Sequence, residues 1–403
     1  MSRLNNNFYT GFFKSDHLSE KDKYLFSKKS PKYKFNIIGA GMIGQEHIMV
    51  TMLEGRAGIN GIFDLSEDSI NNTCRFFREE YPDEKELKVY DTLENACHDP
   101  EVDGLIICTP NFTHIDIVKE AVKSGKHILL EKPMATTLGD AWEIKEMAKD
   151  YQSVFQIGLQ YRHKPIYTEA IHEMLERKSA GDIKSISIVE HRVPFLDKVN
   201  QWNKFTEYSG GTFIEKCCHY FDLLNLFAQS KPEKVYATGG MDVNYKDFEY
   251  EGNKSNIIDN AMVNILYENG IKTQFNLCMF APMFYEEIMV CGDKGRLKAY
   301  ENENFLPLNH NNSYLEILSG EDGAAKTTNP CYPTVIQESG HSGGTYYEHK
   351  HFIDNMEGNH KPTASVEEGF WSIVVGEAAE HSIKTGEVIS INKMLEQDIY
   401  SKV

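Results

Sequence analysis

Short apolar runs alternate with amphipathic stretches over residues 34 to about 155. The amphipathic stretches have helical spacing and cover Ser66–Glu80, His114–Ser124 and Leu138–Tyr151. The apolar runs have the length of buried strands and are Phe35–Ile38, Ile59–Phe63, Leu105–Cys108, Ile128–Leu130 and Val154–Ile157. Because strands that alternate with helices are joined by right-handed crossovers, this half is predicted to form a parallel sheet.

The pattern changes from Asp182 onward, where longer runs follow one another through turns. These runs are Ile183–Glu190, Lys234–Gly239, Asn260–Tyr267, Lys272–Met279 and Glu287–Cys291. The turn Glu268-Asn269-Gly270 separates two of them and predicts a hairpin, which indicates an antiparallel sheet. We expect helices over Gly211–Ala228 and Ser365–Thr385, and a long loop or ragged sheet edge over residues 302–342.

A Gly-x-Gly-x-x-Gly pattern follows the first apolar run, at Gly39-Ala40-Gly41-Met42-Ile43-Gly44. Gly39 would make the tight turn, Gly41 would let a pyrophosphate approach the backbone, and Gly44 would let the next helix pack closely. That helix, expected from Met42 to Leu53, offers free N–H groups to phosphate. Asp64 closes the second apolar run twenty residues past Gly44. This context predicts a dinucleotide site, and the alternative is a plain glycine turn beside a surface aspartate.

Asp64 also bears on which dinucleotide binds. A carboxylate at this position accepts hydrogen bonds from the ribose hydroxyls and repels a 2′-phosphate. The next residues, Leu65-Ser66, include no arginine that could bind such a phosphate. The sequence therefore predicts NAD in preference to NADP.

Together these patterns predict an α/β protein of two domains, which a chain of 403 residues is long enough to form. Residues 34–157 are expected to form a Rossmann dinucleotide-binding domain with a parallel sheet. Residues 158–403 are expected to form an α+β substrate and oligomerisation domain with an open, mostly antiparallel sheet. Residues 1–33 are expected to form an N-terminal arm, which is polar but carries aromatic patches.

Composition narrows the class of partner. The formal net charge of −18 argues against nucleic acid or an anionic membrane as a partner. No apolar run approaches the roughly 20 residues of a membrane span, and the N-terminus lacks the apolar core of a signal peptide. The eight cysteines are scattered without a C-x-x-C pair, so we expect a reducing, cytoplasmic location without disulfides.

Two strand ends in the first half carry candidate chemistry. One apolar run ends in Glu131-Lys132-Pro133, and ligands of open parallel sheets bind outside the carboxyl ends of the strands. Lys132 would then stand beside the cofactor, and the alternative is a surface lysine in a loop. The neighbouring strand end supplies further candidates for the cofactor edge: Thr109, Pro110, Asn111 and His114.

A third segment places Glu215, His219 and Asp222 at i, i+4 and i+7, which is one face of a helix. A carboxylate one turn before a histidine can orient the imidazole and raise its pKa, and histidine suits proton transfer near neutral pH. The alternatives are an amphipathic helix with a satisfied histidine, or a metal site of two carboxylates and one histidine. We expect no metal, because a nicotinamide that takes the hydride makes one unnecessary, and His349 and His351 have no second ligand pair spaced to complete a site.

These blocks together resemble the glucose–fructose oxidoreductase / inositol dehydrogenase family (Gfo/Idh/MocA), from Phe35 to about Asp222 and more weakly to the end. The family's Glu-Lys-Pro motif is matched at residues 131–133, and its Gly-Gly-x3-Asp-x3-His-x2-Asp motif at residues 210–222, with Glu215 at the usual Asp. The resemblance implies that Lys132, Glu215 and His219 are catalytic and that Asp222 supports the helix face. It also implies a homo-oligomer, a dimer or tetramer, built on the open sheet.

The resemblance further implies hydride transfer between NAD and a sugar or cyclic polyol. His219 would take the hydroxyl proton, Lys132 would hold the same oxygen, and Glu215 would hold His219 in the useful tautomer. Candidates for substrate contact are Lys132, His219 and Asp222, with Arg162, Arg192 and Trp202 as softer candidates. The cofactor would be held by Gly39, Gly41, Met42, Ile43, Gly44, Asp64, Thr109, Pro110, Asn111, His114, Glu131 and Lys132. Two alternatives stay open: an eliminase that cleaves glycosides with NAD reduced and reoxidised in one cycle, and a non-catalytic NAD-binding regulator.

Overall fold

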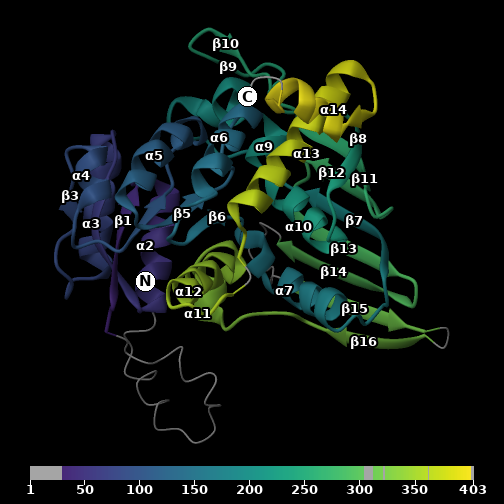
Figure 1. Ribbon diagram of the computed structural model, residues 1–403, viewed down its shortest axis with the longest axis horizontal. Coiled ribbons are helices and arrows are strands. Elements are labelled where there is room, and N and C mark those ends of the chain that lie inside the picture. The colour runs from purple at the N-terminus through teal and green to yellow at the C-terminus, as the bar shows by residue number, and fades with distance from the viewer. Residues whose placement is uncertain (1–29, 304–311, 321–322, 362, 401–403) are drawn as a thin grey trace, which may run out of the picture.

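The computed structural model describes residues 30–303, 312–320, 323–361 and 363–400. Most of the expected N-terminal arm, residues 1–29, lies outside the described residues. The six-stranded sheet and its helices lie on one side of the molecule, and the nine-stranded sheet lies on the other (Figure 1). Helices α12 and α13 lie between them (Figure 1).

The first sheet is parallel and has the strand order β3-β2-β1-β4-β5-β6. Its strands are β1 (Tyr33–Ile38), β2 (Ala57–Phe63), β3 (Lys88–Val89), β4 (Gly104–Ile107), β5 (His127–Glu131) and β6 (Phe155–Gly158). The crossover helices are α2 (Met42–Glu54), α3 (Glu67–Glu80), α4 (Leu93–His98), α5 (His114–Ala121) and α6 (Leu138–Ala148). The predicted parallel sheet is confirmed, with the strand order of a Rossmann fold.

The second sheet has the order β16-β15-β14-β13-β7-β12-β11-β8-β17 and is antiparallel except between β7 and β12. Its strands are β7 (Ile183–His191), β8 (Pro232–Gly240), β11 (Asn260–Tyr267), β12 (Lys272–Cys278), β13 (Phe284–Gly292), β14 (Gly295–Glu303), β15 (Asn312–Ser319), β16 (Ala324–Thr328) and β17 (Ile389–Ser390). A separate small hairpin pairs β9 (Glu249–Tyr250) with β10 (Asn253–Lys254). The mostly antiparallel sheet and the β11–β12 hairpin are confirmed.

The remaining helices connect or cover the two sheets. They are α7 (Pro165–Ile171), α8 (Thr206–Ser209), α9 (Thr212–Glu215), α10 (Cys218–Ala228), α11 (Thr334–Gln337), α12 (Gly344–Met356), α13 (Val366–Thr385) and α14 (Ile391–Leu395). The helix predicted over Ser365–Thr385 is confirmed as α13. It begins with a capping box between Ser365 and Glu368, and Gly386 is its C-cap. The expected ragged edge at residues 302–342 contains β15, β16 and α11, although residues 304–311 and 321–322 lie outside the described part.

Late segments of the chain return to the first sheet. Phe352 and Ile353 of α12 are fully buried in the same apolar cluster as Phe35 and Ile37 of β1. Farther along, the main chain of Ala364 accepts a hydrogen bond from Ile157 of β6 at 2.9 Å. Helix α12 therefore helps to complete the core of the first half, and Ala364 extends the contact to β6.

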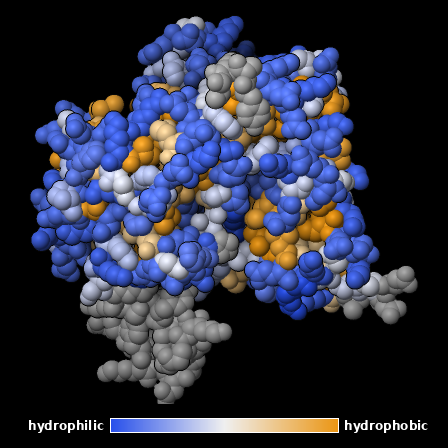
Figure 2. All heavy atoms as spheres, in the orientation of Figure 1, coloured by the Kyte–Doolittle hydropathy of each residue, from blue (hydrophilic) through white to orange (hydrophobic). Residues whose placement is uncertain are grey.

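The surface agrees with the composition. The face drawn in Figure 2 is mostly hydrophilic, as expected from a net charge of −18. Over the residues that the structure describes, we find no helix both long enough and apolar enough to span a membrane.

Candidate active site

The glycine turn lies between β1 and α2 and leaves space at one position only. Gly39 has a φ of +102°, and a Cβ there would lie 2.7 Å from the Cys108 carbonyl carbon. A Cβ on Gly44 would lie 2.2 Å from the Gly39 oxygen, whereas one on Gly41 would meet nothing within 4 Å. Gly39 and Gly44 are therefore required by packing, and Gly41 borders open space where a ligand can approach.

The N-terminus of α2 is equipped for a phosphate group. Gly41 is its N-cap, no side chain caps the helix, and the first turn carries no acidic residue. The first N–H groups of a helix have no partner within it and attract anions. This end of α2, with the space above Gly41, fits the pyrophosphate of a dinucleotide.

Asp64 is fixed by the main chain around it. It follows β2, and its two carboxylate oxygens accept hydrogen bonds from Ala40 N at 2.7 Å and Ser66 N at 2.8 Å. These bonds place a negative charge beside the glycine turn. A carboxylate oxygen has more than one lone pair, so Asp64 can still accept hydrogen bonds from ribose hydroxyls.

The neighbouring strand ends are tied together by His114. Its imidazole is fully buried, and its ring nitrogens lie 2.9 Å from Pro133 O and 3.0 Å from Thr109 O. Burial lowers the pKa of His114. His114 was expected to contact the cofactor, but the structure places it beneath the edge, where it braces the ends of β4 and β5.

Lys132 follows β5 and reaches across to the second half of the chain. Its Nζ donates a hydrogen bond to the main-chain oxygen of Glu215 at 2.9 Å. Burial works against the ammonium charge, but nearby groups, Glu215 foremost, more than offset it and raise the pKa of Lys132. Lys132 is therefore a half-buried cation at the junction of the two halves.

The single helix expected over Gly211–Ala228 is wrong. The chain forms α9, turns at Lys216-Cys217, and begins again as α10. At the turn, the Lys216 side chain donates to the Tyr161 hydroxyl at 2.5 Å and pairs with Glu190 at 3.1 Å. These partners fix the Lys216 side chain at the turn.

The break separates Glu215 from His219. The Glu215 carboxylate accepts a hydrogen bond from the Asn111 amide instead. Asn111 was expected to contact the cofactor, and it connects the end of β4 to α9. The prediction that Glu215 orients the His219 ring is therefore not met, because the two residues lie on opposite sides of the turn.

His219 lies at the start of α10 and is 2% exposed. Its ring stacks on Tyr161, with the centroids 3.9 Å apart and the planes 9° apart, and Nδ1 has no hydrogen-bond partner among the described residues. Burial lowers the pKa of His219 well below its ordinary value, and the positive charges of Lys132 and Lys216 lower it further. His219 is therefore a neutral imidazole with an unused nitrogen, which suits a proton acceptor.

Arg162 and Asp222 form a buried pair. Arg162 donates from Nε and a terminal nitrogen to the two Asp222 oxygens, at 2.6 and 2.5 Å, and also pairs with Glu368 at 2.8 Å. Burial raises the pKa of Asp222 to about 6 even though Arg162 lowers it. Both residues were expected to contact substrate, and the structure shows them bound to each other, which secures α10 to the turn that contains Tyr161.

The other two expected substrate residues, Arg192 and Trp202, follow β7. Arg192 is 3.7 Å from Glu190 and lies over the rings of Phe195 and Phe284. Trp202 is half-buried in the turn η8 (Val199–Lys204). In the part of the chain that the structure describes, neither is recorded in contact with Lys132 or His219.

The structure adds site residues that sequence reasoning missed, namely Tyr161, Lys216 and His341. Tyr161 lies in the turn η6 (Gln160–His163). The Nζ atoms of Lys164 and Lys216 each lie 4.6 Å from the centre of its ring. His341, in the turn η9 (His341–Gly343), lies 6.2 Å from the same ring, measured between centroids. A histidine within the Gly- and Ser-rich run at residues 340–344 was the available signal for His341.

The paired histidines of α12 have separate partners. His349 contacts His47 at 2.7 Å and the Thr51 hydroxyl at 3.1 Å, and His351 packs edge-on against His163. His47 in turn lies 3.0 Å from a carboxylate oxygen of Glu131. Across residues 30–303 and the later described segments, no group of three or more His, Cys, Asp or Glu side chains is placed to hold a metal ion.

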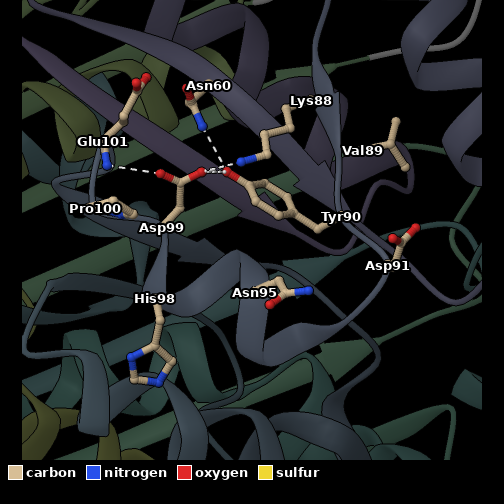
Figure 3. Close-up of a pocket in the computed structure, with 10 residues that line it drawn as sticks. All are labelled: Asn60, Lys88, Val89, Tyr90, Asp91, Asn95, His98, Asp99, Pro100 and Glu101. Carbon is tan, nitrogen blue, oxygen red and sulfur yellow. Dashed lines mark hydrogen bonds and ion pairs between the residues drawn. The ribbon is translucent and has the colours of Figure 1, made fainter.

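A cavity of about 710 Å³ lies at the β3 edge of the first sheet, apart from these residues (Figure 3). Some of the polar groups that line it bind one another. Asp99 accepts hydrogen bonds from Lys88 at 2.6 Å, from Tyr90 at 2.7 Å and from the main chain of Glu101 at 2.9 Å.

Two family models match the chain in the order of its two halves. Residues 33–159 match the oxidoreductase family's NAD-binding Rossmann fold, and residues 172–391 match its C-terminal alpha/beta domain. The second match alone covers more than half of the chain. The protein is therefore an NAD-binding oxidoreductase and belongs to the Gfo/Idh/MocA family.

Individual relatives are distant but nearly full-length. The chain is 24% identical to myo-inositol 2-dehydrogenase of Thermotoga maritima over 378 residues, which cover 90% of this chain and 99% of the relative. It is 25% identical to scyllo-inositol 2-dehydrogenase (NAD(+)) of Bacillus subtilis over 305 residues, 75% of this chain and 80% of the relative. Levoglucosan dehydrogenase in complex with NADH shares the fold, with a TM-score of 0.75 at 17% identity over 89% of this chain and 99% of the other.

Proposed function

We propose that this protein is an NAD-dependent dehydrogenase for a sugar or cyclic polyol, with Lys132 and His219 as its proton-handling residues. One observation carries the proposal: the half-buried Lys132 ammonium and the buried His219 imidazole lie close enough to interact electrostatically at the junction of the cofactor-binding half and the second half. The named activities of the distant relatives, inositol dehydrogenases among them, support the substrate class.

The groups have complementary tasks in this proposal. Bound NAD would supply the hydride acceptor. His219 accepts the hydroxyl proton at a ring nitrogen, since burial and adjacent cations keep the ring neutral. The Lys132 ammonium donates a hydrogen bond to the same oxygen and stabilises its developing negative charge. Glu215 is a positioning residue, because its main-chain oxygen holds Lys132 and its carboxylate holds Asn111.

We also propose NAD over NADP. The Asp64 carboxylate is held beside the glycine turn by two main-chain N–H groups, and Glu67 and Asp68 follow in the first turn of α3. A 2′-phosphate would meet three negative charges there and no arginine. Calorimetric titration of both nucleotides tests this, with binding of NAD at least tenfold tighter expected, which is about 1.4 kcal/mol.

Nucleotide absorbance with a panel of substrates tests the function. The panel contains myo-inositol, scyllo-inositol, levoglucosan, simple sugars and glycosides, each with NAD. Net NAD reduction with a sugar or polyol supports the proposal. Glycoside cleavage without net reduction would favour an eliminase, and tight NAD binding without any turnover would favour a regulator.

We also propose that the protein forms a homo-oligomer and that it works in the cytoplasm. The uncovered face of the nine-stranded sheet carries the adjacent rings of Tyr285, Tyr300 and Tyr314, which would support a homo-oligomer on that face. Light scattering on the purified chain tests it. All eight cysteines are free, which agrees with the reducing cytoplasm.

A further inference from the structure

A histidine held by a carboxylate does occur in this molecule, but it is not His219. Glu46 of α2 accepts hydrogen bonds from His341 Nδ1 at 2.7 Å and from the Thr345 hydroxyl at 2.6 Å. Burial opposes ionisation of Glu46, but His341 and Thr345 more than offset it and bring the pKa of Glu46 to about 2. An ionised carboxylate from the first half therefore fixes an imidazole from the second half.

This pairing decides which atom of His341 is free. Because Nδ1 must carry a proton to donate to Glu46, Nε2 is the nitrogen left for another partner. The His341 side chain is 31% exposed, and the described residues provide no hydrogen-bond partner for Nε2. An oriented imidazole with one open nitrogen is suited to bind a ligand hydroxyl, since it can donate or accept.

His341 shares a wall of the site with the proposed base. Its ring centre is 6.2 Å from that of Tyr161, and Tyr161 stacks on His219 at 3.9 Å. Electrostatic interaction with His341 also contributes to the lowered pKa of His219. The two imidazoles therefore approach one small region from different elements, η9 and α10.

The backbone that carries His341 is strained. His341 and Ser342 have φ values of 44° and 55°, in the left-handed region that residues other than glycine rarely adopt. Gly340 precedes them with a φ of +141°, where a Cβ would lie 2.3 Å from the Glu46 carboxylate. Strain of this kind concentrates at functional sites, and here it brings His341 onto Glu46.

We propose that His341, held by Glu46, binds a substrate hydroxyl other than the one that is oxidised. The inference rests on the proposed dehydrogenase function, in which Lys132 and His219 serve the reacting oxygen. His341 then sets which polyols fit, and Glu46 is a positioning residue that acts through it.

The test compares His341→Gln and Glu46→Gln with the wild type at saturating NAD, using the best substrate of the panel, myo-inositol first. Loss of uniform binding raises KM with kcat little changed. We expect His341→Gln to raise KM by about 10- to 100-fold, the range for one lost hydrogen bond to a charged group, with kcat within about threefold. Glu46→Gln should act in the same direction with a smaller effect. Calorimetry should find the NAD Kd unchanged in both.

His172→Gln is the matched control. His172 also places Nδ1 2.7 Å from a glutamate, Glu176, but it lies on the surface with a 49% exposed side chain. Its kinetics should equal those of the wild type. If His341→Gln does not fold, His341→Gly removes the imidazole and also relieves the left-handed strain, so the same KM rise is expected.

Three outcomes separate the possibilities. An unchanged KM in the His341 variants overturns the inference. A raised NAD Kd with unchanged substrate KM also overturns it, because the pair would then serve the cofactor. A wild type that oxidises no member of the panel overturns the proposed function itself, and the role of His341 with it.

Discussion

The glycine turn and the surroundings of His219 are assembled in different ways. The turn is formed by residues 39–44, and Asp64 completes it from the next strand end through a hydrogen bond to Ala40. His219, by contrast, stacks on Tyr161 of η6. It also interacts electrostatically with Lys132 at the end of β5 and with His341 of η9. The cofactor edge is thus nearly a local structure, whereas the reaction centre exists only when distant segments meet. Substitutions in the two regions should therefore separate cofactor binding, turnover and stability.

Lys132→Ala should have a large effect and should act on turnover alone. It removes the half-buried ammonium at the junction, and loss of one donor to a developing oxyanion costs about 10²–10³-fold in kcat. Steady-state kinetics measure kcat, and calorimetry on the same sample should give the wild-type Kd for NAD. Equal losses of turnover and NAD affinity would mean that Lys132 belongs to the cofactor edge instead.

Asp222→Ala should destabilise the protein through the region around His219. It leaves Arg162 buried with Glu368 alone, and removing one partner of a buried pair costs about 3–5 kcal/mol of unfolding free energy. Denaturant titration measures the loss. The control is Glu143→Ala, which removes an exposed partner of Lys119 and should cost no more than about 1 kcal/mol. Similar losses in both variants would contradict the structural role of the Arg162–Asp222 pair.

Two glycine substitutions at the cofactor edge should separate an effect on stability from an effect on NAD binding. Gly44→Ala places a Cβ 2.2 Å from Gly39 O and should destabilise the protein by about 1–3 kcal/mol. Gly41→Ala meets no protein atom and should leave stability within about 0.5 kcal/mol while weakening NAD binding. Thermal unfolding and calorimetry distinguish these results. A Gly41→Ala variant with unchanged NAD affinity would show that no ligand approaches that position.

The pH profile should give the smallest and most specific effect. His219 must be neutral to accept a proton, and burial lowers its pKa well below the ordinary 6.5. As pH falls, the oxidation rate should therefore persist through about 6.5 and decline only at lower pH. Profiles of kcat/KM from about pH 5 to about pH 8 measure this. An acidic limb centred at or above 6.5 would contradict a buried neutral base.

The difference between a site formed by nearby residues and one formed by distant segments explains what could be predicted from the sequence. The glycine turn, Asp64 and the strand end at Lys132 follow from consecutive residues and regular periodicity, so the fold and the cofactor edge were predictable. The break after Glu215 was not, because the contacts made at the turn are long-range: Lys216 binds Tyr161, 55 residues earlier. The helical spacing therefore predicted a Glu215–His219 pair that does not form. His341 was missed for the same reason, since its partner Glu46 lies 295 residues away.

His219→Ala, followed by stopped-flow absorbance with saturating NAD and the best polyol, tests the account most directly. The account predicts that NAD reduction slows by about 10²–10⁴-fold, the usual contribution of a positioned general base, while NAD binds as in the wild type. NAD reduction at the wild-type rate would contradict it.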